Sequence, residues 1–160
     1  MKRLIGLVCL AALAAPDRTA LQTVEKMVDR RIETLFDDPF LLLGMTRGVY
    51  VEGVGLVLSA EVGLAVTAAG PLAARLSKED MARLRQKRLD RLPVLRASMQ
   101  EILQRTAVML ETMPAQENVV LGVTIFRKSN EDNTGLPGQI VMRATRQDLL
   151  DKKTAQVSEF

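Results

Sequence analysis

The spacing of apolar residues changes along this chain of 160 residues and separates helical from extended stretches. After Pro16, apolar residues recur every three or four positions on an otherwise charged stretch, which predicts an amphipathic helix that ends near Pro39. Asp17 is the expected N-cap, because its carboxylate can accept a hydrogen bond from an amide of the first turn. The apolar stripe consists of Leu21, Val24, Val28, Ile32 and Leu35.

The period changes to two between Phe40 and Leu64, which predicts a β-hairpin around a two-residue turn at Glu52 and Gly53. In that register Tyr50 lies directly opposite Gly55, so its ring covers a bare backbone. One face is the expected core face: Leu43, Met45, Val49, Val51, Val54, Leu56, Leu58, Ala60, Val62 and Leu64. The other face carries mostly small or polar residues: Gly44, Thr46, Gly48, Tyr50, Gly55, Val57, Ser59, Glu61 and Gly63.

A long helix is predicted next, from Lys78 to Met113, because apolar residues keep a spacing of three and four along its second half. Ser77 and Asp80 have the spacing of a capping box at its start. Pro93 is expected to kink or divide this helix, since proline removes one backbone hydrogen bond and crowds the preceding turn.

Two more strands are predicted after the long helix, over 119–127 and 139–144, followed by a short helix capped by Thr145 and Asp148. The last residues are expected to fray. The predicted fold class is therefore α+β, with the order α-β-β-α-β-β-α, a four-stranded, mainly antiparallel sheet and one long kinked helix. We expect the helices to cover the sheet face that carries Leu56 and Leu58.

The N-terminus has the pattern of a secretory signal peptide. Lys2 and Arg3 precede a short apolar run, and Ala12-Leu13-Ala14 supplies the small residues that a signal peptidase needs. We therefore expect a signal peptide at 1–14, a single α+β domain at 15–160, and an exported protein that is periplasmic or secreted. A membrane span over 53–74 is the alternative, but Glu61, the glycines and Pro71 argue against it.

Composition restricts the chemistry more than it defines it. The chain has 22 basic and 19 acidic residues, and loss of Lys2 and Arg3 would reduce the net charge from +3 to about +1, so we expect no nucleic-acid partner. It has no histidine, and Cys9, the single cysteine, lies in the expected signal peptide. Ser-His-Asp and Cys-His catalysis are thereby excluded. We expect no cofactor or metal site, and an enzyme is the less favoured class.

The segment Arg47-Gly48-Val49-Tyr50-Val51-Glu52-Gly53-Val54-Gly55, continued by Val57 and Glu61-Val62, resembles the opening hairpin of a group of exported bacterial proteins without assigned function. The basic long helix and the stretch from Val141 to Leu150 are similar to theirs as well. The resemblance implies export and the same element order, and no catalytic residues. The element order is also similar to that of roadblock and profilin-like domains, which are small scaffolds for protein contacts.

Two functions follow from these patterns. The first is an exported scaffold or protein-binding module that contacts an unidentified protein through the face carrying Tyr50, Ser59 and Glu61, since small side chains permit close approach and tyrosine often anchors contacts. The alternative is a peripheral protein of the cell envelope whose basic helix binds an anionic membrane surface. Its expected anion-binding residues are Arg85, Arg88 and Arg91. The competing interpretation is that both surfaces are solvated or packed inside the fold.

Overall fold

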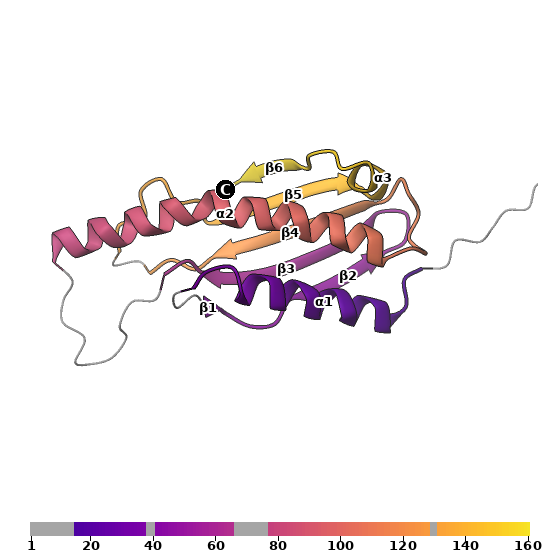
Figure 1. Cartoon of the computed structure of the whole chain (residues 1–160), viewed down its shortest axis with the longest axis horizontal. Coiled ribbons are helices and arrows are strands. Elements are labelled where there is room, and N and C mark those ends of the chain that lie inside the picture. The colour runs from indigo at the N-terminus through magenta and orange to yellow at the C-terminus, as the bar shows by residue number, and fades with distance from the viewer. Residues whose placement is uncertain (1–14, 38–40, 66–76, 129–130) are drawn as a thin grey trace, which may run out of the picture.

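The computed structural model of the chain describes residues 15–37, 41–65, 77–128 and 131–160, which form three helices and six strands (Figure 1). The expected signal peptide lies outside these residues. In chain order the elements are α1 (Arg18–Glu33), β1 (Leu41–Leu42), β2 (Arg47–Val51), β3 (Gly55–Gly63), α2 (Lys78–Met109), β4 (Asn118–Ile125), β5 (Gln139–Thr145), α3 (Arg146–Leu150) and β6 (Gln156–Glu159).

The strands form one mixed sheet. β1 and β2 pair one after the other with the same edge of β3, and the sheet continues through β4 and β5 to β6. The α+β class and the long helix are confirmed, but the four-stranded sheet is wrong in its details. The chain leaves β3, crosses the sheet as α2 and re-enters as β4, so β3 and β4 run parallel at the centre of the sheet.

The C-terminal residues form a strand, which corrects the prediction that they fray. β6 pairs antiparallel with β5, with Ile140 opposite Glu159 and Arg143 opposite Gln156. Arg96 of α2 donates a hydrogen bond of 2.6 Å to Glu159 and so ties this edge strand to the helix layer. A segment of four residues is too short for its alternation to stand out in the sequence.

α1 and α2 lie side by side across one face of the sheet and bury its apolar residues (Figure 1). We call this the covered face. The expected core positions of β3 are confirmed, because Leu56, Leu58, Ala60 and Val62 are all buried, as is Leu64 directly after the strand. The helices contribute Val24, Val28, Ile32, Leu95, Met99, Ile102 and Leu103, and β4 contributes Val119, Leu121, Val123 and Ile125.

The register of the hairpin differs by one residue from the predicted one. Val51 lies opposite Gly55, so three residues connect the strands instead of two, and Gly53 at their centre has a positive φ of 78°. A shift of one residue turns every side chain of a strand to the other face. Tyr50 consequently faces the helices with Leu56, whereas Val49 and Val51 are 62% and 46% exposed. Leu43, Met45 and Val54, also expected in the core, are exposed as well.

Among the described glycines, Gly55 is the one that another strand approaches most closely, where β4 meets the start of β3. Its φ is +125°, and a Cβ atom at this position would lie only 1.9 Å from the carbonyl oxygen of Asn118. Only glycine therefore permits β4 to approach the start of β3 this closely. Gly55 is buried between Val51 on β2 and Asn118 on β4, whereas the predicted register placed it opposite Tyr50.

The predicted helix starts are confirmed at the level of single hydrogen bonds. Asp17 accepts from the amide of Ala20 at 2.6 Å, and Ser77 accepts from the amide of Asp80 at 3.1 Å. Thr145 caps α3 in the same way. α2 is one uninterrupted helix of 32 residues that contains Pro93 and ends at Met109, so the proline does not divide it.

The edge of the sheet at β2 is covered by carboxylates of α1. The amide of Gly48 donates to Oε1 of Glu25 and the amide of Thr46 donates to Oδ1 of Asp29, both at 2.8 Å. Glu25 and Asp29 are one helical turn apart, which matches the spacing of two residues along an extended strand. The opposite edge, formed by β6, consists of exposed residues.

Candidate functional site

The three residues expected to form one contact face lie on both sides of the sheet. Ser59 and Glu61 are exposed on the face that no helix covers among the described residues, which we call the open face. Tyr50 points to the covered face, because it lies opposite Leu56 in the observed register. The prediction that Tyr50 shares a surface with Ser59 and Glu61 is therefore wrong, and the cause is the three-residue connection of the hairpin.

Tyr50 holds the hairpin in place through a buried carboxylate. Its hydroxyl donates to Oε2 of Glu117 at 2.8 Å, and the amide of Gly53 donates to Oε1 of the same residue at 2.8 Å. Glu117 is 5% exposed, so these two bonds replace water that the carboxylate has lost. Burial, followed by the hydrogen bond to Glu117, raises the pKa of Tyr50 to about 12. This arrangement is structural.

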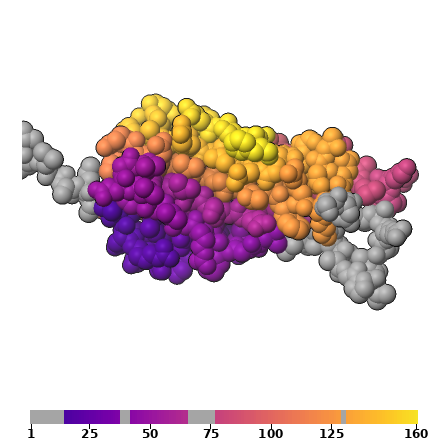
Figure 2. All heavy atoms as spheres, turned by 180° about the vertical axis from the view of Figure 1, so that it is seen from behind, coloured from indigo at the N-terminus to yellow at the C-terminus, as the bar shows by residue number. Residues whose placement is uncertain are grey.

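Ser59 and Glu61 line a shallow hollow of about 250 Å³ on the open face, together with Thr124 and the segment 43–45. The open face extends from this hollow across the sheet (Figure 2). Its outward-facing residues, by register, are Arg47, Val49, Val51, Val57, Ser59, Glu61, Val120, Gly122, Thr124, Gln139, Val141, Arg143, Gln156 and Ser158. In Figure 2 the strands form this surface, and atoms of α1 and α2 emerge only at its margins.

Valine dominates the middle of the open face. Val49 and Val57 lie directly opposite each other on β2 and β3, and Val57 lies beside Val120 on β4. Val49 is 62% and Val57 is 42% exposed. Gly122, beside Ser59 on β4, leaves a low point next to these valines, and a Cβ atom there would meet only ordinary contacts at 3.9 Å. The sequence pattern indicated a flat open face but placed Val49 in the core.

The three arginines expected to bind anions make contacts inside the protein. Arg88 pairs with Glu131 at 2.6 Å, and the two side chains are only 6% and 5% exposed. Arg91 donates to the carbonyl of Leu64 at 2.5 Å and lies over the ring of Phe36. The basic part of α2 thus binds acceptors from the chain's own loops.

Arg85 belongs to the same set of internal contacts. It donates to the carbonyl of Thr134 at 2.8 Å and lies 3.8 Å from the carboxylate of Asp132. An external anion would have to displace these acceptors from Arg85 and those from Arg88 and Arg91. The acidic loop that follows β4 therefore binds Arg85 and Arg88, whereas Arg91 contacts Leu64 and Phe36, and no sequence spacing connects these segments with α2.

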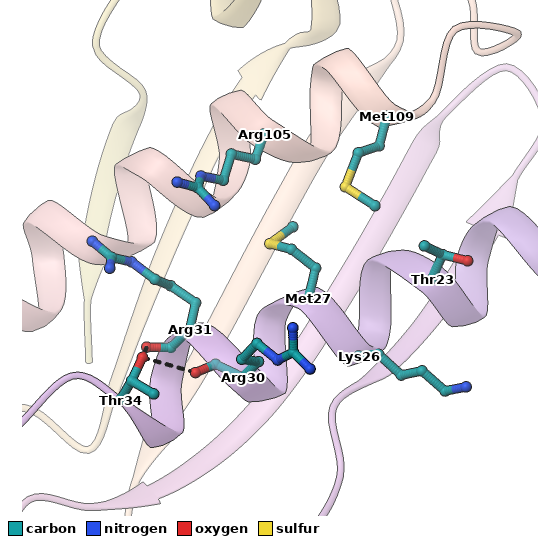
Figure 3. Close-up of a pocket in the computed structure, with 8 residues that line it drawn as sticks. All are labelled: Thr23, Lys26, Met27, Arg30, Arg31, Thr34, Arg105 and Met109. Carbon is teal, nitrogen blue, oxygen red and sulfur yellow. Dashed lines mark hydrogen bonds between the residues drawn. The ribbon is translucent and has the colours of Figure 1, made fainter.

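A second cationic surface, which the sequence patterns did not indicate, lies between α1 and α2 (Figure 3). It is a groove of about 500 Å³ on the outer side of the helix layer, away from the sheet. Its lining residues are Thr23, Lys26, Met27, Arg30, Arg31, Thr34, Arg105 and Met109. The helices bring together residues more than seventy positions apart, which is why no local signal could reveal the groove.

The described residues give no sign of metal chemistry or of a membrane span. They contain no group of three or more histidine, cysteine, aspartate or glutamate side chains placed to hold a metal ion. None of the helices found in them is long and apolar enough to cross a bilayer. Comparisons with models of known families, with curated proteins and with solved structures find no match to this chain.

Proposed function

We propose that this chain is an exported protein-binding module that holds its partner against the open face of the sheet. The observation that carries this proposal is the row of valines on that face. Val49 and Val57 are exposed and Val120 is half-buried, and together they form a row across three strands that no helix among the described residues covers. Contiguous exposed apolar residues with a polar rim are typical of protein interaction sites.

The charges around the valine row define the kind of partner. Arg143 on β5 lies beside Val120 and so follows the valine row at one end. Arg47 on β2 lies in the adjacent row of residues, beside Ser59, toward the opposite edge of the sheet. Adjacent strands lie about 4.8 Å apart, so the two arginine backbones are separated by roughly 14 Å across the sheet. A partner segment with an apolar ridge and acidic residues on both sides complements this surface.

The anionic-lipid function through Arg85, Arg88 and Arg91 has less support from the geometry, because all three guanidinium groups already have internal acceptors.

Export rests on the sequence pattern of the first fourteen residues. N-terminal sequencing of the mature protein from cells tests it. Export predicts a chain that begins at Ala15, whereas an intact form beginning at Met1 in the cytoplasm would contradict it.

Site-specific photo-crosslinking in intact cells tests the binding surface. A crosslinking side chain is placed at Val57 on the open face or, as a matched control, at Val94 on α2, which is similarly exposed at 44% against 42%. We expect a product with another protein from position 57 and not from position 94. A peptide spanning the crosslinked partner segment should then bind the purified protein.

Gly122→Arg sharpens this test, because a Cβ atom at this position meets only ordinary contacts and the rest of the arginine side chain would extend over the open face. The variant should keep its melting temperature and lose both the crosslink and the peptide binding. The proposal is contradicted if positions 57 and 94 give the same product, if Gly122→Arg still crosslinks, or if position 57 reacts only with lipid or a second copy of the chain.

A further inference from the structure

The groove between α1 and α2 has a cationic end and an apolar end. The arginine end consists of Arg30, Arg31 and Arg105, and the methionine end consists of Met27 and Met109 with the neighbouring Val108. Figure 3 shows Arg31 and Arg105 on facing helices at one end of the groove. Met27 and Met109 both point into the space between the two helices, the guanidinium of Arg30 is turned along α1 toward Lys26, and Lys26 points away from α2.

The positive charge of the arginine end is not balanced within the described part of the chain. Arg31 is the one member that forms a salt bridge there, with Glu101, whereas Arg30 and Arg105 have no salt bridge with a described residue. The described residues that line the groove include no carboxylate. Nε of Arg31 is also buried without an acceptor among these residues. Clustered like charges repel one another, and a bound anion removes that repulsion.

The methionine end provides the second half of the recognition surface. Met27 packs partly against the core, and Val108 and Met109 are exposed beside it. Together with Gln104 and Arg105 these residues line an adjoining hollow of about 400 Å³. Flexible methionine side chains adapt to aliphatic ligands of different shape. An apolar hollow next to a cationic one matches a molecule with a charged head and an aliphatic chain.

We infer that the groove binds a single anionic amphiphile, with its phosphate-type head against the arginine end and its aliphatic chain along the methionine end. Arginine suits such a head, because its planar guanidinium group donates two parallel hydrogen bonds to phosphate oxygens. This site lies on the opposite side of the molecule from the open face, so it is independent of the proposed protein-binding function.

Titration with octyl phosphate, below the concentration at which it forms micelles, tests the inference on the purified protein. Nuclear magnetic resonance of isotope-labelled methionine methyl groups reports the location of the ligand. We expect the signals of Met27 and Met109 to shift, while that of Met142, buried on the covered face, stays unchanged. Inorganic phosphate has the head without the chain. Its affinity should be lower than that of octyl phosphate by a factor of about ten or more.

Charge variants separate the arginine end from other basic surfaces. Arg30→Gln and Arg105→Gln should each weaken octyl phosphate binding about tenfold, since each removes a charge-assisted hydrogen bond. Arg83→Gln is the matched control, because Arg83 is an exposed arginine of α2 outside the groove, and it should leave binding unchanged. Met109→Ser should weaken octyl phosphate but not inorganic phosphate.

Three results would overturn the inference. Equal affinity for inorganic phosphate and octyl phosphate would show a site for free anions. Equal affinity for uncharged octyl glucoside would show that the arginines play no part in binding. Binding to vesicles of anionic phospholipid without any binding of octyl phosphate would show a membrane-surface site rather than a site for one molecule.

Discussion

The covered and the open face of the sheet are built from the same strands, yet they differ completely in their surroundings. Leu58 is fully buried under the helices, and its neighbour Ser59 is exposed on the other side. On β2 the contrast reverses the usual residue preferences, since Val49 is exposed and Tyr50 is half-buried. The face that a side chain occupies is thus decided by strand register and not by its hydrophobicity alone.

The largest effect is expected from placing a charge on the covered face. Leu58→Asp should lower the free energy of unfolding by roughly 4 kcal/mol, because it buries an unpaired carboxylate in the core. Ser59→Asp, one position further on the open face, should change it by less than about 0.5 kcal/mol. Urea unfolding of both variants measures the difference. Equal losses would contradict the orientation of β3.

A smaller effect distinguishes the two possible registers of β2. Tyr50→Ala should lower the free energy of unfolding by about 2 kcal/mol, because the ring packs against the core and the buried Glu117 loses a donor. Val49→Ala should cost less than about 1 kcal/mol, since this side chain is exposed. Urea unfolding decides between them, and a larger loss for Val49→Ala would favour the two-residue turn.

A pH dependence is also expected that is specific to the covered face. The pKa of Tyr50 is raised from 10.0 to about 12 by burial and by Glu117, so the folded chain keeps a phenol proton that the unfolded chain loses. This contribution to stability is complete below pH 10 and is lost as the pH rises toward 12. The Tyr50→Phe variant has no phenol proton to lose. Its free energy of unfolding should therefore fall less than that of the unmodified protein between pH 10 and pH 12.

Tyr50 is the only tyrosine, so the ultraviolet absorbance of its phenolate reports this pKa directly. Glu117→Gln is the control, because it removes the negative charge beside the phenol and should move the pKa of Tyr50 back toward its ordinary value. A phenol that titrates near pH 10 in the folded protein would contradict the contact with Glu117.

The parts of the fold that could be predicted are those with strong local signals. Asp17, Ser77 and Thr145 cap their helices as expected, because capping involves residues only three positions apart. The alternation of β3 is long enough to fix its faces. The register of β2 depends on whether Val54 belongs to the strand or to the connection. The sequence is compatible with the predicted two-residue turn and with the observed three-residue connection. β6 was missed because its pairing with β5 is specified by tertiary contacts.

The candidate sites were harder to predict, because they combine distant segments. The run of arginines in α2 suggested an exposed cationic surface, but Glu131 and the carbonyl of Leu64 meet two of them inside the fold. The groove between the helices requires Arg30 and Arg105 to lie together, and that depends on how α1 packs beside α2. The spacing of charges along one segment shows neither which acceptors the arginines of α2 meet nor how α1 packs beside α2.

The carboxylates of Glu25 and Asp29 also limit how copies of this protein can assemble. A sheet grows into a fibre only when both of its edges accept a further strand. Here the amides of Thr46 and Gly48 are already occupied at one edge, and β6 offers the free edge at the other. A further strand can therefore pair with β6 more readily than with β2, because two outward amides of β2 already have carboxylate acceptors.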